Sequence, residues 1–390
     1  MAENKSKRIE SLDLVKGLVM IIMALDHVRE YFHYDAFLFD PTDPDSTNIS
    51  LFFTRWITHY CAPAFSFLAG ISAYLVGRKK TKLELSSFLL KRGIWLIFIE
   101  FTVVNFAWFF DIHFNTIGLL VIWSLGISMM FLAILIYFRL KYILIFSVLL
   151  IFGHNSLDFF EIEKGIFWSI FHEFNMFSLE NDKILFVGYP IIPWIGIMSL
   201  GYYFGSFYNT TIESSRRRNT FKMIGLITIL GFIVIRLMNG YGNLSYWESY
   251  DTITKSIFSF LNPAKYPPSL TYILMTLGPI FLTLAYTEQV KGKIVAFISV
   301  FGKVPFFYYI VHLYIIHFFA LFLAWVTDFG WEKMIIRGWV TESAELDGFG
   351  VNLIYVYLLW IAVIVILYPM CKKFGLYKIN NKDKKWLSYL

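Results

Sequence analysis

The residues best suited to chemistry lie on one apolar segment, residues 11–34, near the start of the chain. This segment is long enough to cross a bilayer, yet it contains Lys16, Asp26, His27 and Arg29. A charged side chain near the centre of a membrane helix costs roughly 2.5–3.5 kcal/mol, so such residues are rare and are candidates for function. The segment therefore predicts a membrane helix that takes part in a reaction.

The spacing of Lys16 and His27 places them on one side of this helix. They are eleven positions apart, which at 100° per residue brings them within about 20° of one another and separates them by about 16 Å along the axis. An imidazole titrates near neutral pH and can take a proton from an amine or a hydroxyl group. This layout suits a site that binds an anionic substrate at one end and reacts near the other.

The composition of the chain is that of a polytopic membrane protein. Of its 390 residues, 57% are hydrophobic and only 16% are charged, whereas soluble domains carry about 25% charged residues. The mean hydropathy is +0.60, and the 20% of aromatic residues suits a lipid-facing surface with aromatic belts. We expect a single all-α membrane domain over residues 1–390, with a basic cytoplasmic tail at 372–390.

Ten apolar runs are long enough to cross a membrane as helices, and their lengths allow a count of nine to eleven. They lie at about residues 12–34, 51–76, 88–110, 117–138, 142–158, 186–207, 221–239, 270–287, 304–327 and 351–371. The connections on one side of these runs carry 24 Lys and Arg residues, and those on the other side carry 6. Because cytoplasmic loops are enriched in Lys and Arg, both termini are predicted to be cytoplasmic, in a multi-pass protein of the cell membrane. This distribution explains the net charge of +6 without nucleic acid as a partner.

Polar residues in the other predicted spans complete the candidate site. They are Arg55, His59, Lys91, Arg92, Glu100 and His312. The predicted topology places Lys91 and Arg92 at the inner surface and the others at mid-depth or near the outer surface. Each also has a structural explanation, because charged residues at helix ends often serve as anchors and buried charges often form ion pairs.

Metal binding and disulfide bonding are not indicated. His312 and His317 are five positions apart, which is about 140° around a helix, so they do not form a two-histidine metal face. Cys61 and Cys371, the only cysteines, show neither a zinc-binding spacing nor a disulfide framework. We therefore expect no metal in the site.

Small residues in two of the runs indicate close helix packing. Gly201 and Gly205 are four positions apart, and Gly70 is followed closely by Ser72. Small residues at this spacing allow two helix backbones to approach one another in a membrane. The face that carries Gly201 is also compatible with a homodimer.

The segment RIESLDLVKGLVMIIMALDH resembles the first helix of the transmembrane acyltransferases. These include bacterial relatives of heparan-alpha-glucosaminide N-acetyltransferase and, more distantly, the acyltransferase family three proteins, which O-acylate cell-surface sugars. In the latter group an Arg and a His separated by ten residues mark this helix, and Lys16 and His27 occupy those positions. Further similar segments are RWITHYCAPAFSFLAGISAYL, LLKRGIWLIFIE, YPIIPWIGIMSLGYYFG and FGKVPFFYYIVHLYIIH.

The resemblance implies an integral membrane acyltransferase that uses acetyl-CoA, or another acyl-CoA, as its co-substrate. The acyl group would move to an amine or hydroxyl group of a sugar or glycan on the outer side of the membrane, and membrane lipid would surround the protein. The phosphates of CoA would bind to cations at the inner surface, for which Lys16, Lys91 and Arg92 are best placed. His59, Glu100 and His312 are further candidates for substrate binding.

His27 would then act as the general base on the attacking amine or hydroxyl group. Asp26 is 100° from His27 around the helix, so it is better placed to hold Arg29 or a neighbouring residue than to pair with His27. Arg55 or Arg29 would stabilise the oxyanion of the tetrahedral intermediate.

A transporter or flippase is the alternative, since buried charges can also couple transport to ions, with Glu100, Arg236 and His312 as relay residues. The sequence shows no pair of interrupted helices in corresponding halves, which argues against it. A family member that has lost catalysis and only binds a partner is a third alternative, because Lys16 stands where the related group has Arg. Turnover of acyl-CoA would separate the first function from the other two.

Overall fold

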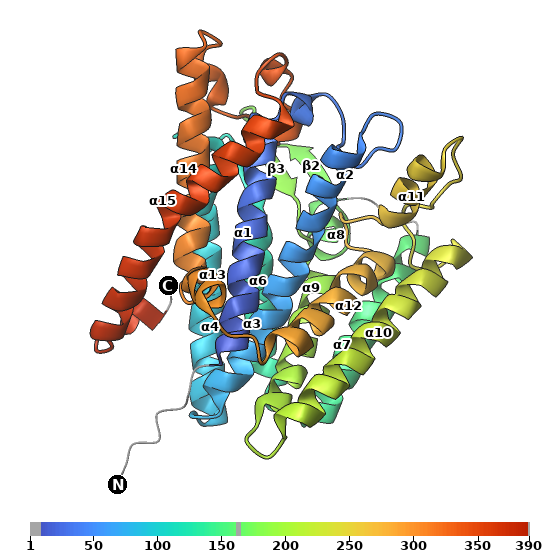
Figure 1. Cartoon of the computed structure of the whole chain (residues 1–390), viewed down its shortest axis with the longest axis vertical. Helices are drawn as coiled ribbons and strands as arrows, with labels where there is room; N and C mark the ends of the chain where they lie inside the picture. The colour runs from blue at the N-terminus through green and yellow to red at the C-terminus, as the bar shows by residue number, and fades with distance from the viewer. Residues whose placement is uncertain (1–8, 161–164, 389–390) are drawn as a thin grey trace.

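The structure, a computed structural model, describes residues 9–160 and 165–388, and helices make up most of them (Figure 1). The longer helices are α1 (Glu10–Phe32), α3 (Cys61–Gly77), α4 (Lys82–Ile99), α6 (Val121–Leu135), α7 (Leu140–Gly153), α9 (Ile191–Gly205), α10 (Ser214–Met238), α12 (Leu270–Thr287), α14 (Pro305–Val326) and α15 (Leu353–Asn380). The shorter ones are α2 (Ile49–Trp56), α5 (Asn105–Phe109), α8 (Ile166–Phe171), α11 (Ile253–Leu261) and α13 (Lys293–Gly302). Each of the ten predicted apolar runs overlaps one of the longer helices.

Six helical stretches in the described residues are long and apolar enough to cross a membrane, as expected of a multi-pass membrane protein. They are Ile49–Gly77, Leu140–Phe159, Ser214–Met238, Leu270–Thr287, Pro305–Val326 and Leu353–Asn380. Helix α1 is not among them because its charged residues interrupt the apolar sequence. The count of ten spans and the cytoplasmic position of both termini therefore stay predictions.

A small β-sheet corrects the all-α prediction. Strand β1 (Thr116–Leu119) pairs in parallel with β3 (Ile184–Val187), and β2 (Asn175–Ser178) pairs with the other edge of β3 in the antiparallel direction. The predicted runs 117–138 and 186–207 therefore begin with a strand and a turn, and continue as α6 and α9. The sequence did not indicate these strands for two reasons. A run of four apolar residues fits a strand as well as the start of a buried helix, and the strands that pair are far apart in the sequence.

Two helices are interrupted near the middle of the molecule. The second predicted span is continuous from Ile49 to Gly77 but tightens into a 3₁₀ turn at Ile57–Tyr60, between α2 and α3. The third changes from α4 to a π-helical stretch at Glu100–Val104 before α5. The Asn105 side chain donates a hydrogen bond of 2.6 Å to the Glu100 carbonyl oxygen in this stretch. Such π-helical turns are often found near functional sites.

Helices α3 and α9 pack closely at glycine residues, as their small residues predicted. A Cβ atom at Gly70 would lie 2.0 Å from the carbonyl oxygen of Met198, and one at Gly201 would lie 2.0 Å from that of Phe67. Only glycine allows backbones this close. Helix α3 covers the Gly201 face of α9, so a second copy of the chain cannot reach it. The expected homodimer therefore does not form through this face.

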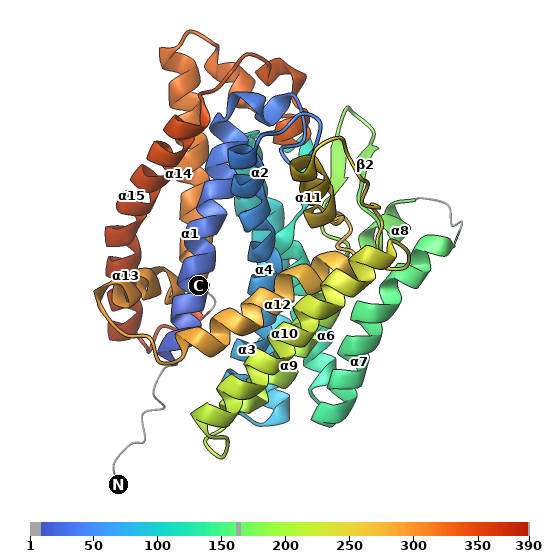
Figure 2. The ribbon, with the colours of Figure 1, turned by 45° about the vertical axis from the view of Figure 1, so that its right-hand side comes forward.

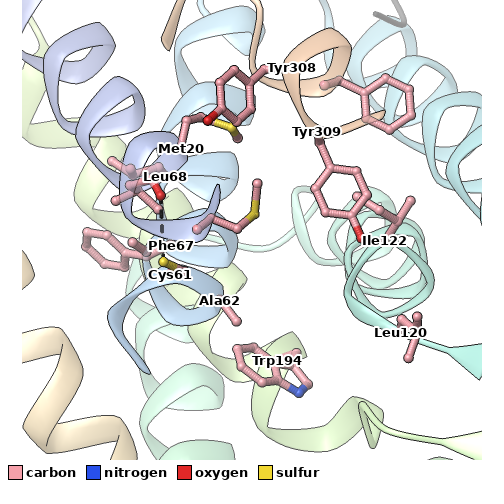
Figure 3. Close-up of a cluster of buried hydrophobic side chains, with 14 of the residues drawn as sticks. Met20, Cys61, Ala62, Phe67, Leu68, Leu120, Ile122, Trp194, Tyr308 and Tyr309 are labelled. Atoms are coloured by element: carbon pink, nitrogen blue, oxygen red, sulfur yellow. Dashed lines mark hydrogen bonds between the residues drawn. The ribbon is translucent and has the colours of Figure 1, made fainter. Parts of the chain in front are cut away.

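Helix α1 lies at the centre of the molecule. It packs against α3 and α12 on one side and against α13, α14 and α15 on the other (Figures 1 and 2). Apolar side chains from several helices meet beside it, including Met20, Phe67, Trp194 and Tyr308 (Figure 3). The charged residues of the C-terminal half of α1 are consequently enclosed by protein.

Candidate active site

Three cavities lie along α1. The first, nearest the N-terminal end of α1 and named the inner cavity, has a volume of about 210 Å³ and contacts α1 at Lys16 and Met20. The second, named the central cavity, has a volume of about 50 Å³ and is lined by His27. The third, named the outer cavity, has a volume of about 360 Å³ and lies at the C-terminal end of α1, next to Arg29 and Glu30.

These cavities adjoin one another because they share lining residues. The inner and central cavities share Phe65, Val121 and Tyr309. The central and outer cavities share Glu30, Leu120, Tyr189, Tyr266 and Trp339. The three therefore form a series along α1, from the region of Lys16 to the loops beyond Arg29, with His27 in the middle section.

His27 is paired with His312 of α14. The Nδ1 atom of His27 lies 2.8 Å from Nε2 of His312, and Nδ1 of His312 lies 3.0 Å from the carbonyl oxygen of Tyr308. A carbonyl oxygen only accepts hydrogen bonds, so in a neutral pair His312 carries its proton on Nδ1 and accepts at Nε2. His27 then donates from Nδ1, and the hydrogen-bond network assigns the free lone pair to its Nε2 atom.

Trp108 holds the other side of the His27 ring. The two ring centroids are 4.8 Å apart, with the rings at 72°, an edge-to-face geometry that is favourable for aromatic pairs. Trp108 belongs to α5, which follows the π-helical stretch. Contacts from α5 and α14 thus fix the imidazole in one orientation.

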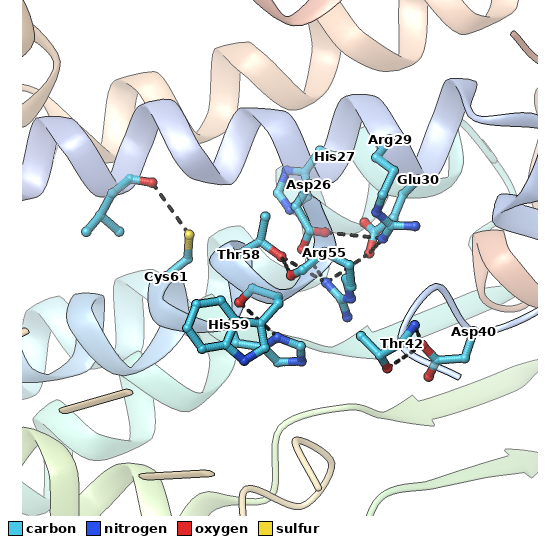
Figure 4. Close-up of polar contacts among 12 residues, drawn as sticks. Asp26, His27, Arg29, Glu30, Asp40, Thr42, Arg55, Thr58, His59 and Cys61 are labelled. Atoms are coloured by element: carbon cyan, nitrogen blue, oxygen red, sulfur yellow. Dashed lines mark hydrogen bonds and ion pairs between the residues drawn. The ribbon is translucent and has the colours of Figure 1, made fainter. Parts of the chain in front are cut away.

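A cluster of four buried charged residues lies next to His27, near the C-terminal end of α1 (Figure 4). Arg55 donates to Asp26 at 2.5 Å, and Arg29 donates to the other oxygen of Asp26 at 3.2 Å. The same two arginines lie 3.9 and 3.4 Å from Glu30. All four side chains are at most 12% exposed. Each arginine lies close to both carboxyl groups, and such pairing is the condition under which buried ions are tolerated.

The outer cavity has aromatic walls and a polar rim. The rings of Phe186 and Trp339 stack with centroids 4.9 Å apart, and both line the cavity. At its rim, burial acts to raise the pKa of Asp40, but hydrogen bonds from Thr42 outweigh this effect and lower the pKa of Asp40 below its usual value. Asp40 is therefore an anion at the rim at neutral pH. An aromatic pocket with a few fixed polar groups is typical of a site for a small organic ligand.

The inner cavity is mainly apolar, with two cations among its lining residues. Lys16 donates a hydrogen bond of 2.7 Å to the Ser72 hydroxyl group, and Arg92 contributes from α4. Lys91, the third cation expected here, is exposed and does not line the cavity. Of these two adjacent residues, Arg92 therefore lines the inner cavity and Lys91 lies on the surface.

Two other expected site residues have structural partners instead. Glu100 accepts a hydrogen bond of 2.8 Å from the backbone N–H of Trp123 in the first turn of α6, where a carboxylate stabilises the helix. His59 contacts the carbonyl oxygen of Trp56 at 3.1 Å and packs against Tyr272. Neither lines any of the three cavities. In the described residues, no group of three or more His, Cys, Asp or Glu side chains is arranged to hold a metal ion.

Several lining residues were not among the predicted site residues. Glu30 is four positions from Asp26 and so on the same side of α1, a signal that could have identified it. Lys265, Tyr266 and Trp339 come from outer loops, and their sequence surroundings give no indication of a site. Their positions depend on how loops far apart in the chain fold over the end of α1.

Comparison with known families adds independent information. Residues 8–237 match the family model for heparan-alpha-glucosaminide N-acetyltransferase, catalytic. This match covers more than half of the chain, from α1 nearly to the end of α10, and includes His27 and the four-charge cluster. It does not extend to Lys265 or His312. No curated protein matches the chain.

Proposed function

The chain belongs to the family of heparan-alpha-glucosaminide N-acetyltransferase catalytic domains, and from this premise we propose that it transfers an acetyl group across a cell membrane. The donor is acetyl-CoA on the inner side, and the acceptor is an amine or hydroxyl group of a sugar on the outer side. The observation that carries the proposal is the series of three adjoining cavities along α1, with His27 in the central one.

The inner cavity suits the donor. The nucleotide end of CoA carries several phosphate groups, and Lys16 and Arg92 supply positive charge at this cavity, where charge-assisted hydrogen bonds are the strong ones. The apolar walls between them and His27 suit a thin chain that crosses the membrane without surrounding water. The acetyl thioester would then reach the central cavity, whose small volume of about 50 Å³ leaves room for a small acyl group.

His27 supplies the proton transfer. Its Nε2 atom accepts a proton from the amine or hydroxyl group as that group attacks the carbonyl carbon of the thioester. The new bond to carbon forms, the carbon–sulfur bond breaks, and the departing CoA thiolate takes the proton from His27. His312 holds the imidazole in the required tautomer through the 2.8 Å contact, so it is a positioning residue.

The outer cavity suits the acceptor. Aromatic walls and the charged rim offer both apolar contact and hydrogen bonds to a sugar ring. In this proposal the four-charge cluster fixes α1 to α2 by way of Arg55 and Asp26 and so sets the position of His27. The prediction that Arg55 or Arg29 stabilises an oxyanion stays open, but the ion pairs of both arginines favour the positioning role.

The proposal is tested by acetyl transfer in detergent, with purified protein, acetyl-CoA and glucosamine as the probe acceptor. Wild-type protein should form acetylated glucosamine, and His27→Ala should lower kcat by about 10²–10⁴-fold, the usual contribution of a general base. His113→Ala is the matched control, because His113 is exposed on an outer loop, and it should retain wild-type activity. Full activity in a folded His27→Ala protein would contradict the mechanism.

A further inference from the structure

One cation in the central cavity has no role in the function proposed so far. Lys265 lies in the outer segment between α11 and α12, and it lines the central cavity together with His27. It is half-buried, and its ammonium group lies 4.9 Å from the centroid of the Tyr266 ring. Tyr266 lines both the central and the outer cavity, and Lys265 lines the central one beside it.

Lys265 differs from the two arginines nearby in its partners. Arg29 and Arg55 are ion-paired with Asp26 and Glu30. Within the described part of the chain, Lys265 forms neither an ion pair nor a hydrogen bond. Its ammonium donors are therefore free to bind a group that enters the cavity.

The ion pairs around the site reinforce this difference. Asp26 and Glu30 already pair with Arg29 and Arg55, so Lys265 brings a further positive charge to the central cavity, without a paired carboxylate in the described part of the chain. A positive charge in a small cavity lined by protein interacts more strongly than in bulk water with a negative charge that forms there, since the local dielectric constant is lower. The positive charge of Lys265 would therefore stabilise an anion that forms in the cavity during the reaction.

We propose that Lys265 is a catalytic residue whose ammonium group stabilises the oxyanion of the tetrahedral intermediate. This inference rests on the proposed function. When the acceptor amine attacks, the carbon–nitrogen bond forms and one electron pair of the carbonyl group moves to oxygen, next to Lys265, while His27 takes the amine proton. When the intermediate collapses, that pair re-forms the carbonyl group, the carbon–sulfur bond breaks, and CoA leaves as the thiol with the proton from His27.

The experiment compares Lys265→Met and Lys265→Arg with Lys255→Met. Lys255 is the matched control because it is also an outer lysine, but it is exposed and pairs with Asp45 at 2.9 Å on the surface. Acetyl transfer from acetyl-CoA is measured to glucosamine and, separately, to hydroxylamine, a small nucleophile without a sugar ring. The two acceptors separate a role in the reaction from a role in sugar recognition.

Lys265→Met should lower kcat by about 10²–10³-fold with both acceptors, the usual effect of removing one oxyanion donor, and should leave the KM for acetyl-CoA within a few-fold. Lys265→Arg keeps the charge and should recover part of the activity, which also shows that the fold is intact. Lys255→Met should behave as wild type.

Three results would overturn the inference, and they are distinguishable. Undiminished kcat in Lys265→Met would refute the role of Lys265 alone. Loss of transfer to glucosamine with normal transfer to hydroxylamine would assign Lys265 to sugar binding. Wild-type protein that transfers acetyl groups to neither acceptor would refute the proposed function, and the inference with it.

Discussion

Two buried arginines, Arg55 and Arg236, are used in opposite ways in this molecule. Arg55 pairs with Asp26 beside the central and outer cavities. Arg236 lies near the end of α10 and donates to the carbonyl oxygens of Phe260, Ser245, Ser259 and Asn262 and to the side chain of Asn243. It lines none of the three cavities.

The difference shows that a buried charge alone does not mark a functional site. The donors of Arg236 are used by backbone carbonyl groups, so it fixes the outer loop that follows α10. The partners of Arg55 are the carboxyl groups of Asp26 and Glu30 on α1, and Asp26 is adjacent to His27 in the chain. The hydrogen-bond partners, together with a neighbouring cavity, separate the two roles. Arg236 and Glu100, two of the three relay residues expected for a transporter, both have structural partners.

The largest effect that tests this comparison is expected for Arg55→Met. The change leaves Asp26 with Arg29 as its ion-pair partner and loosens the contact between α1 and α2, on which the position of His27 depends. We expect kcat for acetyl transfer to fall by about 10²-fold, as misplacement of a reacting group by about 1 Å can produce. Steady-state kinetics of the purified protein measures kcat. An unchanged kcat would show that Arg55, like Arg236, has only a structural role.

The next effect concerns the adjacent residues Arg92 and Lys91. Arg92 lines the inner cavity and Lys91 is exposed outside it. A charge-assisted hydrogen bond contributes about 1.5–3 kcal/mol, so Arg92→Ala should raise the KM for acetyl-CoA by about tenfold or more. Lys91→Ala is the control and should change it by less than about threefold, as expected for an exposed charge. Equal effects would show that general surface charge binds the donor.

The smallest effect on catalysis is expected for Arg236→Met. The variant leaves several buried carbonyl groups without a donor, each at a cost of about 1–3 kcal/mol, so the protein should melt at a lower temperature. The kcat of the folded fraction should stay within about threefold of wild type, since Arg236 touches no cavity residue of the site. Thermal unfolding monitored with kinetics at low temperature gives both values, and a large loss of kcat at normal stability would link α10 to the reaction.

The helices were predictable from sequence because long apolar runs and charge asymmetry are local signals. The small-residue packing of α3 against α9 was predictable for the same reason. The polar residues of α1 were also recognisable, because they interrupt an apolar run. The spacing of Asp26 and Arg29 predicted their interaction.

The rest of the site depends on contacts between distant parts of the chain. His27 and His312 are 285 positions apart, and although both were candidate site residues, nothing in the sequence indicated that they pair. The sheet required the pairing of β1 with β3 across α6, α7 and α8, and no periodic pattern distinguished strands of four residues. Lys265 lies in a loop whose sequence gives no sign of a functional site. Only its position in the folded chain identifies it as a candidate.

The proposed function requires the cavities to connect a donor on one side of the membrane to an acceptor on the other. Sealed liposomes that contain the purified protein can separate the two substrates, with radiolabelled acetyl-CoA on one side and glucosamine on the other. Labelled acetylglucosamine should form in the glucosamine compartment without leakage of acetyl-CoA, and none should form with His27→Ala. Product that forms only when both substrates share one compartment would contradict this requirement.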